Sequence, residues 1–278
     1  MVGWRALWAA LMLWTAAVSG ASAVCAAPRA ELWPYWQQHN PANWRRIDHT
    51  RWDSFLRRYL VTDDSSGIHR VRYAAVSVQD RGLLKHYLAD LAEVKVTQLD
   101  RPEQRAFWIN LYNALTVKVI LDHYPVTSIR DIDISPGLFQ RGPWDAKLIR
   151  IEDLHLSLND IEHRILRPIW RDARLHYALN CASLGCPNLA TEPFSATNSE
   201  QLLEQAASTF INHQRGVRFD AGRLELSSIY KWYEDDFGTS RAELINHLRR
   251  YARPDLANSL KNYRGQIVYR YDWQLNAP

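Results

Sequence analysis

The chain has 278 residues, of which 47% are hydrophobic and 23% are charged. This composition excludes a disordered polar chain, a collagen and a small disulfide-dominated scaffold. The formal net charge is only +4 and no run of five Lys or Arg residues occurs, so we expect no nucleic-acid partner. The length suits one large domain or two small ones, either with a proper hydrophobic core.

Residues 1–26 have the pattern of a secretory signal peptide. Arg5 supplies a positive charge, residues 6–19 are uncharged and almost wholly apolar, and small residues follow. One alternative is an uncleaved anchor, although the apolar run is shorter than the ~20 residues that a spanning helix needs. Another is lipid attachment at Cys25, although residues 22–24 match that pattern poorly. We expect a periplasmic or secreted protein without a membrane span after signal removal.

The rest of the chain predicts more helices than strands. Residues 27–68 form an N-terminal arm with a helix near 48–60 and a loop at 62–68, and residues 69–278 form the main domain. Helices are expected over 79–93, 102–123, 157–167, 199–213, 228–237 and 241–251. The last of these follows a capping box formed by Ser240 and Glu243. Strands are expected over 147–151, 173–180, 216–220, 223–227 and 266–273. We predict a single α+β domain, with several helices around a small, mostly antiparallel sheet.

The helix expected over 102–123 is apolar nearly all round. Residues 107–121 (FWINLYNALTVKVIL) contain four non-apolar side chains, which is typical of a buried helix. Asn110 and Asn113 are three positions apart and share a face. Buried amides need hydrogen-bond partners. These asparagines therefore either bridge the backbone of loops or line a polar site.

Two cysteines remain after signal removal, Cys181 and Cys186, five positions apart in the loop NCASLGCPN. A turn there would bring their Cα atoms within the ~4.4–6.8 Å that a disulfide requires, and export favours oxidation. The alternatives are a reduced catalytic or redox thiol and a metal site. A single C-x4-C lacks the usual four-ligand spacing, so we predict no metal site. The sequence also has no glycine-rich nucleotide-binding motif, and we predict no cofactor.

Seven motifs occur in an order that resembles one known family. They are FWINLYNALT, SIRDI, PWDAKL, LSLNDIEHRILRP, HYALNCASLGCP, SSIYKWYEDDFG and YDWQLN, between about residues 70 and 276. The chain is similar to the family of domain of unknown function 547 (DUF547). The resemblance implies an exported bacterial protein or a related eukaryotic domain. It implies no agreed cofactor and assigns no catalytic residue.

A more distant analogy concerns the order of the elements. A buried helix, a later segment with a histidine, and then a segment with Trp and Asp resemble the order in papain-like and transglutaminase-like cysteine enzymes. Those enzymes place a cysteine at the N-terminus of the helix, where the helix dipole lowers the thiol pKa. Residues 102–123 contain no cysteine and carry Phe107, Trp108 and Asn110 there instead. The analogy therefore concerns the fold alone.

His176 and Cys181 are the obvious pair of imidazole and thiol. On a continuous strand over 173–180 they would stand roughly 16 Å apart, so they meet only if the chain turns sharply near Asn180. The same strand would place His176 and Asn180 on one face, toward Asn110 of the buried helix. We predict a convergent polar site in which these four residues are the candidate catalytic groups.

Five further residues are candidates for ligand binding: Asn113, Glu162, His163, Trp232 and Asp236. Glu162 and His163 are neighbours in sequence and diverge by ~100° on a helix, so they do not make a ready pair. Trp232 either packs in the core or stacks on a sugar or peptide. Asp236 either caps a helix end or faces the site.

Two functions compete on this sequence. The first is a cysteine-dependent hydrolase or acyl transferase that acts on peptide or amide bonds. Cys181 would be its nucleophile, His176 or His163 its base, and an asparagine would orient the base or donate to an oxyanion. The second is a non-catalytic binding or assembly module with a structural disulfide, whose cleft holds a peptide, amide or glycan-like ligand of the cell envelope. A thiol-redox protein is a third, weaker interpretation.

Overall fold

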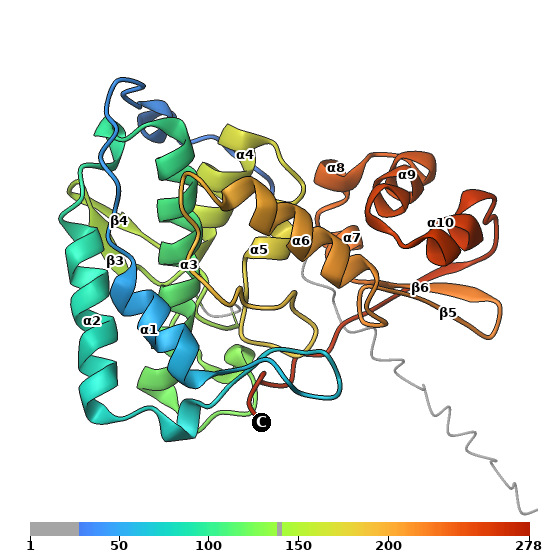
Figure 1. Cartoon of the computed structure of the whole chain (residues 1–278), viewed down its shortest axis with the longest axis horizontal. Helices are drawn as coiled ribbons and strands as arrows, with labels where there is room; N and C mark the ends of the chain where they lie inside the picture. The colour runs from blue at the N-terminus through green and yellow to red at the C-terminus, as the bar shows by residue number, and fades with distance from the viewer. Residues whose placement is uncertain (1–27, 138–140) are drawn as a thin grey trace, which may run out of the picture.

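The computed structural model describes residues 28–137 and 141–278. Figure 1 shows a larger body that contains α1, α2 and α3, and a smaller lobe that contains α7 to α10. Each part has its own cluster of buried apolar side chains. The predicted signal peptide, including Cys25, lies outside the described residues.

The body is built around α3 (Arg101–His123), which confirms the helix predicted there. The Asp100 side chain caps it by accepting from the Glu103 backbone N–H at 2.9 Å. Side chains from Ala106 to Val117 are all buried. The other elements of this half are η1 (Pro34–Gln37), α1 (Thr50–Tyr59), β1 (Leu60–Val61), β2 (Arg70–Val71), η2 (Tyr73–Ala75), α2 (Val78–Ala92), η3 (Val96–Gln98) and η4 (Ile129–Asp131).

The predicted arm belongs to the same core as α3. Trp36 and Trp52 are each 1% exposed, and the Trp36 ring meets that of Trp108 edge to face at 5.0 Å. β1 and β2 pair as an antiparallel ribbon across the loop at 62–68. None of the described helices is long and apolar enough to cross a membrane.

The middle of the chain connects the two parts. It contains β3 (Ile149–Ile151), β4 (Leu154–Leu156), the π-helix η5 (Asp160–Leu166), α4 (Arg167–Trp170), α5 (Leu175–Ala178) and α6 (Ser199–Ile211). The predicted strand over 173–180 is wrong, because α5 occupies its centre. The Asp172 carboxylate accepts from the Arg174 backbone N–H at 2.9 Å, and this turn starts the helix. Over so short a segment, alternating polar and apolar residues fit both the period of a helix and the period of a strand.

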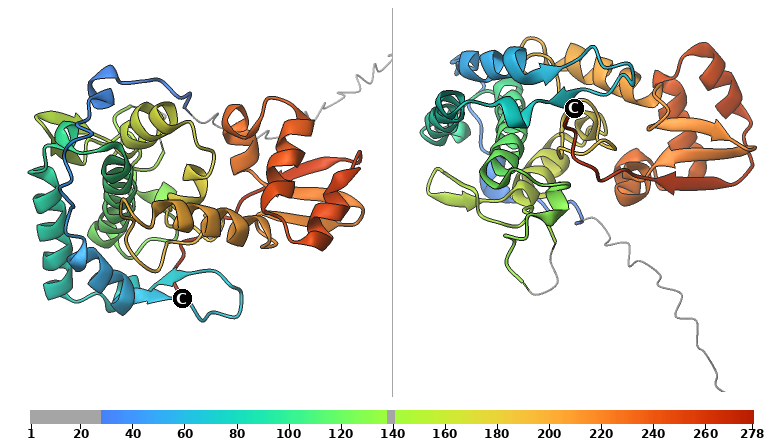
Figure 2. Two further views of the ribbon diagram at one scale, coloured as in Figure 1. Left: turned by 45° about the horizontal axis from the view of Figure 1, so that its top comes forward. Right: turned by 90° about the horizontal axis from the view of Figure 1, so that it is seen from below.

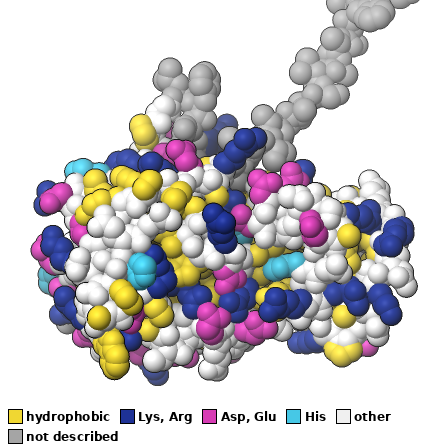
Figure 3. Space-filling view, turned by 90° about the horizontal axis from the view of Figure 1, so that it is seen from above, with side chains coloured by type: hydrophobic (Ala, Val, Ile, Leu, Met, Phe, Trp, Pro, Cys, Tyr) yellow, Lys and Arg dark blue, Asp and Glu magenta, His cyan; other side chains and the backbone are white. Residues whose placement is uncertain are grey.

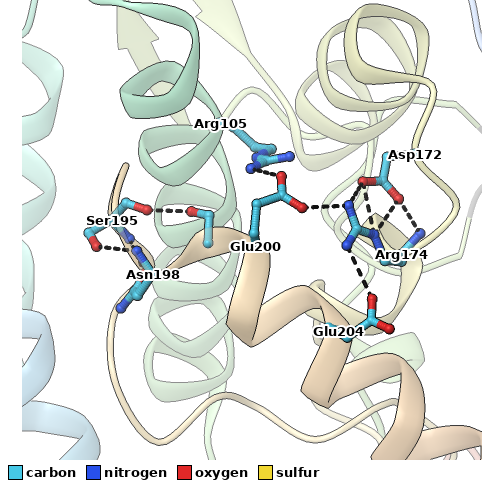
Figure 4. Close-up of polar contacts among 8 residues, drawn as sticks. Arg105, Asp172, Arg174, Ser195, Asn198, Glu200 and Glu204 are labelled. Atoms are coloured by element: carbon cyan, nitrogen blue, oxygen red, sulfur yellow. Dashed lines mark hydrogen bonds and ion pairs between the residues drawn. The ribbon is translucent and has the colours of Figure 1, made fainter. Parts of the chain in front are cut away.

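α6 joins the two parts of the molecule. Leu203 belongs to the larger apolar cluster, and Phe210 belongs to the smaller one. Figure 4 shows how the start of α6 is tied to its neighbours. The Glu200 carboxylate pairs with Arg105 of α3 at 2.5 Å and with Arg174 at 2.8 Å. An exposed ion pair contributes only about 0–1 kcal/mol to the stability of the fold. We therefore expect this network to orient α6 more than to stabilise the protein.

The C-terminal lobe contains a three-stranded sheet and four helices. β5 (Val217–Asp220) and β6 (Arg223–Ser227) form the predicted hairpin, and β7 (Ile267–Arg270) runs parallel to β6. The helices are α7 (Ile229–Trp232), α8 (Glu234–Phe237), α9 (Arg241–Tyr251) and α10 (Pro254–Lys261). The capping box predicted at Ser240 is present at the start of α9. Figure 2 shows this lobe at the opposite end of the molecule from α1 and α2.

The α+β class is confirmed, with several small sheets in place of one. Among the described residues, β1–β2, β3–β4 and β5–β6 are antiparallel and β6–β7 is parallel. The helix predicted over 157–167 is present, but most of it, η5, is a π-helix. α10 and the β1–β2 ribbon were not predicted. On the face seen in Figure 3, basic and acidic side chains are interspersed. This pattern agrees with the small net charge of +4.

Candidate functional site

A buried ionic cluster forms where the body meets the C-terminal lobe. Its centre is His176 of α5, whose Nε2 lies 2.6 Å from Oδ2 of Asp236 on α8. The other ring nitrogen, Nδ1, lies 3.6 Å from Oε1 of Glu162 on η5. Carboxylates only accept when ionised, so Nε2 carries the proton donated to Asp236. The imidazole therefore lies between two carboxylates contributed by distant segments.

Arg167 completes this cluster and was missed by the sequence analysis. Its Nε donates to Asp236 Oδ2 at 2.6 Å, and its Nη1 lies 3.1 Å from His163 Nδ1. Arginine has no acceptor, so His163 Nδ1 must accept. The available signal was the spacing of four residues between His163 and Arg167 on a helix.

Tyr233 forms one wall of the cluster. Its ring stacks on that of His176, with centroids 4.1 Å apart and planes at 17°. The Arg167 guanidinium lies 4.9 Å from the same ring centroid. Burial raises the Tyr233 pKa well above its ordinary value, and the negative charge of Glu162 adds to the effect. An aromatic face thus covers the charged groups.

The π-helix η5 brings Glu162 and His163 to the same place. Ser157 and Asp160 bind each other's backbone N–H groups at 2.9 and 3.1 Å and start the segment. At its end, the Arg167 N–H bonds to the Glu162 carbonyl, five residues back. Although we expected the neighbouring side chains to diverge, His163 Nδ1 lies 4.0 Å from Glu162 Oε1. The wider turn of the π-helix accounts for the difference.

The charges of the cluster compensate each other. Burial disfavours ionised Glu162, but His163, His176 and Arg167 outweigh it and hold the Glu162 pKa at about 2. Burial likewise opposes ionisation of Asp236, and the bonds from His176 and Arg167 still lower its pKa. For His163, burial outweighs the attraction of Glu162 and lowers the pKa to about 4. At neutral pH, His163 is therefore an uncharged acceptor.

Access to the cluster is limited. The side chains of His176 and Glu162 are 2% and 7% exposed, whereas that of Asp236 is 22% exposed. Solvent therefore approaches most readily from the side of Asp236. No group of three or more His, Cys, Asp or Glu residues is arranged to hold a metal within residues 28–137 and 141–278.

Cys181 and Cys186 lie at disulfide distance, with Cα atoms 6.2 Å apart, inside the range considered from the sequence. The Cys181 backbone N–H lies 2.9 Å from Cys186 Sγ. The Tyr271 hydroxyl lies 3.0 Å from Cys181 Sγ and 3.2 Å from Cys186 Sγ. Burial raises the Tyr271 pKa, and the charge of Glu162 contributes. Tyr271 thus contacts both sulfur atoms of the disulfide loop, residues 181–186.

The candidate asparagines bind backbone. Asn110 accepts from the Phe194 N–H at 3.0 Å and donates to the Phe194 carbonyl at 2.8 Å. Asn113 accepts from the Asn180 N–H and donates to the Ala178 carbonyl, both at 2.9 Å. The sequence left two interpretations of these asparagines open. In the structure, both side chains bridge loop backbone.

Asn180 also acts within its own loop. Its amide donates to the Pro187 carbonyl at 2.7 Å and accepts from the Ala182 N–H at 2.8 Å. Asn113 therefore contacts Asn180 as expected, whereas the His176 side chain lies in the ionic cluster. The reason is α5: its helical turn replaces the strand alternation that would have put His176 and Asn180 on one face.

Trp232 packs with other aromatic residues. Its ring lies 4.7 Å from that of Tyr271 and stacks on that of Trp273 at 5.5 Å and 29°. All three side chains are half-buried. This arrangement matches the packing interpretation and leaves part of each ring open to solvent.

A hollow of about 520 Å³ lies between the disulfide loop and the C-terminal lobe. Leu184 and Gly185 of the loop line one side, and Arg215, Arg270 and Tyr271 belong to its lining as well. A Cβ at position 185 would lie 2.8 Å from backbone atoms of residue 272, so a glycine permits this close approach. The disulfide loop thus forms one wall of the hollow.

Comparisons with known proteins give one match. A family described as "Protein of unknown function, DUF547" matches residues 96–211. This range includes α3, η5, α5 and the disulfide loop, while Asp236 and Tyr271 lie beyond it. No curated protein and no solved structure is significantly similar to the chain. The resemblance inferred from the motifs is confirmed over residues 96–211, where the chain matches the DUF547 family model.

Proposed function

We propose that this protein is an exported, non-catalytic binding module whose Cys181–Cys186 disulfide is structural. The observation that carries the proposal is that both groups needed for thiol chemistry already have partners. Cys181 lies at disulfide distance from Cys186, with Cα atoms 6.2 Å apart. His176 lies between the carboxylates of Asp236 and Glu162.

The ionic cluster supports this proposal because its charged and polar groups bind one another. A general base needs a nitrogen directed at the proton that it removes. His176 directs Nε2 to Asp236 at 2.6 Å, and its Nδ1 faces Glu162 at 3.6 Å. Arg167 of the body bonds to Asp236 of the C-terminal lobe at 2.6 Å. In our proposal, the cluster holds the two parts of the molecule in a fixed orientation.

The ligand of the module occupies the hollow beside the disulfide loop. Its volume of about 520 Å³ suits a short peptide or a small glycan. The loop wall is firmly placed, because Leu184 N–H and Gly185 N–H donate at 2.8 Å to carbonyls of residues 274 and 272. A disulfide in this loop limits its freedom before binding, which reduces the entropic cost of binding.

Export is the second part of the proposal. It rests on the signal-peptide pattern of residues 1–26. The pairing of Cys181 with Cys186 agrees with an oxidising compartment. The ligand would then be a component of the cell envelope or its surroundings.

The cysteine hydrolase is a second candidate, favoured by a specific observation. An imidazole held by a carboxylate at 2.6 Å, as in His176 and Asp236, is also how a catalytic histidine is oriented. The sulfur of Cys181 contacts the hydroxyls of Ser183 and Tyr271 at 3.3 and 3.0 Å. This enzyme would require a reduced Cys181 and a rearrangement that directs His176 toward it.

Single replacements of the cysteines test the proposal. In a structural disulfide, Cys181→Ser and Cys186→Ser break the same bond and should cost similar stability. For this short loop we expect about 2 kcal/mol from each, measured by urea unfolding without reductant. Each variant is the matched control for the other. A Cys181→Ser variant as stable as the wild type, with a wild-type Cys181 that iodoacetamide modifies rapidly, would favour the hydrolase.

A further inference from the structure

Arg215 is a half-buried cation in the lining of the hollow, and its hydrogen-bond partners are neutral. Its Nη1 donates to the Leu184 carbonyl at 3.0 Å, and its Nη2 donates to the Asn188 side-chain oxygen at 2.5 Å. Its Nε is buried and has no hydrogen-bond partner. Burial lowers the Arg215 pKa to about 10, so the side chain still carries its charge at neutral pH. Among the described residues, no carboxylate lies within ion-pair distance of it.

The other two arginines of the hollow share one carboxylate partner. Arg218 and Arg270 both pair with Glu225, the latter through Nε at 2.8 Å. The Glu225 side chain is only 3% exposed and lies between them. Arg215 thus differs from its neighbours in lacking a carboxylate partner. A buried charge without a counter-ion is costly, so the site favours an anion.

The charges of the lining indicate what kind of anion fits. Three arginines stand against Glu225 and Asp272, which leaves one formal positive charge. His213 adds none, because burial lowers its pKa and its Nε2 bonds to the Ser66 carbonyl at 2.7 Å. One excess charge matches a monoanion better than a dianion such as phosphate. A carboxylate is also the planar partner that a guanidinium prefers.

We propose that Arg215 binds a carboxylate group of the ligand in this hollow. The inference rests on the proposed binding function and specifies the ligand as a monoanionic carboxylate. The bond from Arg215 to the Leu184 carbonyl couples the guanidinium to the disulfide loop. The loop therefore holds the cation in place before the ligand arrives, as preorganised binding requires.

The carboxylate of such a ligand has two chemical sources, a peptide or a sugar acid. The probes are therefore N-acetyl-Ala-Ala with a free C-terminus and glucuronate. Each is compared by calorimetry with its neutral partner, N-acetyl-Ala-Ala amide or glucuronate methyl ester. We expect at least one acid to bind the wild type at least tenfold more tightly than its neutral partner. The acid that binds identifies the source.

Substitutions test whether Arg215 is the carboxylate anchor, that is, the residue of the hollow that binds the carboxylate. Arg215→Gln should weaken binding of the acid by tenfold or more and leave the neutral partner unaffected. Arg215→Lys should retain part of the affinity, since it keeps the charge without the planar fork. Arg264→Gln, at an exposed position of the same lobe, should change nothing.

The wild-type comparison of acid and neutral probes needs no variant, so it decides even if a variant fails to fold. Equal binding of both members of each pair would overturn the carboxylate anchor while the binding function stands. Binding of neither acid would also overturn the anchor. The cysteine variants test the binding module separately, because their readout is stability.

Discussion

The substitution His163→Asn tests whether the ionic cluster is a closed internal network. His163 is 3% exposed and accepts from Arg167 through Nδ1, and an Asn side-chain oxygen can take over that role. Its pKa is lowered from 6.5 to about 4 by burial. The unfolded chain therefore binds a proton at a higher pH than the folded one. The stability contributed by neutral His163 is complete above pH 6.5 and is lost as the pH falls toward 4.

The size of the effect follows from the two pKa values. The wild type should lose about 2 kcal/mol through this residue by pH 5 and about 3 kcal/mol by pH 4. His163→Asn should lack this part of the pH dependence, whatever its stability at pH 7. The free energy of unfolding is measured by urea titration at intervals between pH 7.5 and pH 4, and the slopes are compared.

The same substitution at exposed His86 on α2 controls for the removal of an imidazole as such. If His163→Asn and the wild type lose stability in parallel between pH 6.5 and pH 4, His163 is not a buried neutral acceptor. The description of the cluster as a closed network would then be refuted.

Three other substitutions test the packing around the site. Asn113→Ala leaves two buried backbone groups of segment 178–180 without partners, and we expect a loss of about 2–5 kcal/mol in urea unfolding; wild-type stability would show that these bonds are unimportant. Ser240→Ala removes the cap of α9 and should cost about 1 kcal/mol, which a shift of the unfolding midpoint would reveal. Gly216→Ala places a Cβ 2.0 Å from the Phe210 carbonyl oxygen, so the connection between α6 and β5 must shift and the melting temperature should fall; an unchanged value would contradict this contact.

The long helices could be predicted from the sequence because their signals are local. α3 has an N-cap acid, an early proline and a long apolar run, and the structure begins it at Arg101. α9 was predicted from its capping box. Short elements carry much weaker signals. The four-residue α5 was expected to be a strand, because its apolar alternation suits both periods and a tertiary contact decides.

The sequence predicted several residues of the candidate site, but it did not predict how they contact one another. Glu162, His163, His176 and Asp236 were each singled out, and the structure brings all four together. Their meeting depends on the helical turn at His176 and on residues up to 74 positions apart in the sequence, counted from 162 to 236. No local pattern contains such information.

Arg215 was missed for a related reason. Its significance lies in the absence of a nearby carboxylate within the described residues and in its place at the hollow, and neither is a property of the sequence around it. By contrast, the disulfide distance between Cys181 and Cys186 could be considered from spacing alone, because only five positions separate them.

The most direct test of the central claim is a count of free thiols in the folded protein. The full chain is expressed with export to an oxidising compartment, purified without reductant, treated with iodoacetamide and assigned by mass spectrometry. If Cys181 and Cys186 form a structural disulfide, neither should be alkylated until the protein is reduced. Alkylation of Cys181 in the native protein, with a reactivity that persists well below pH 8.5, would contradict a non-catalytic module.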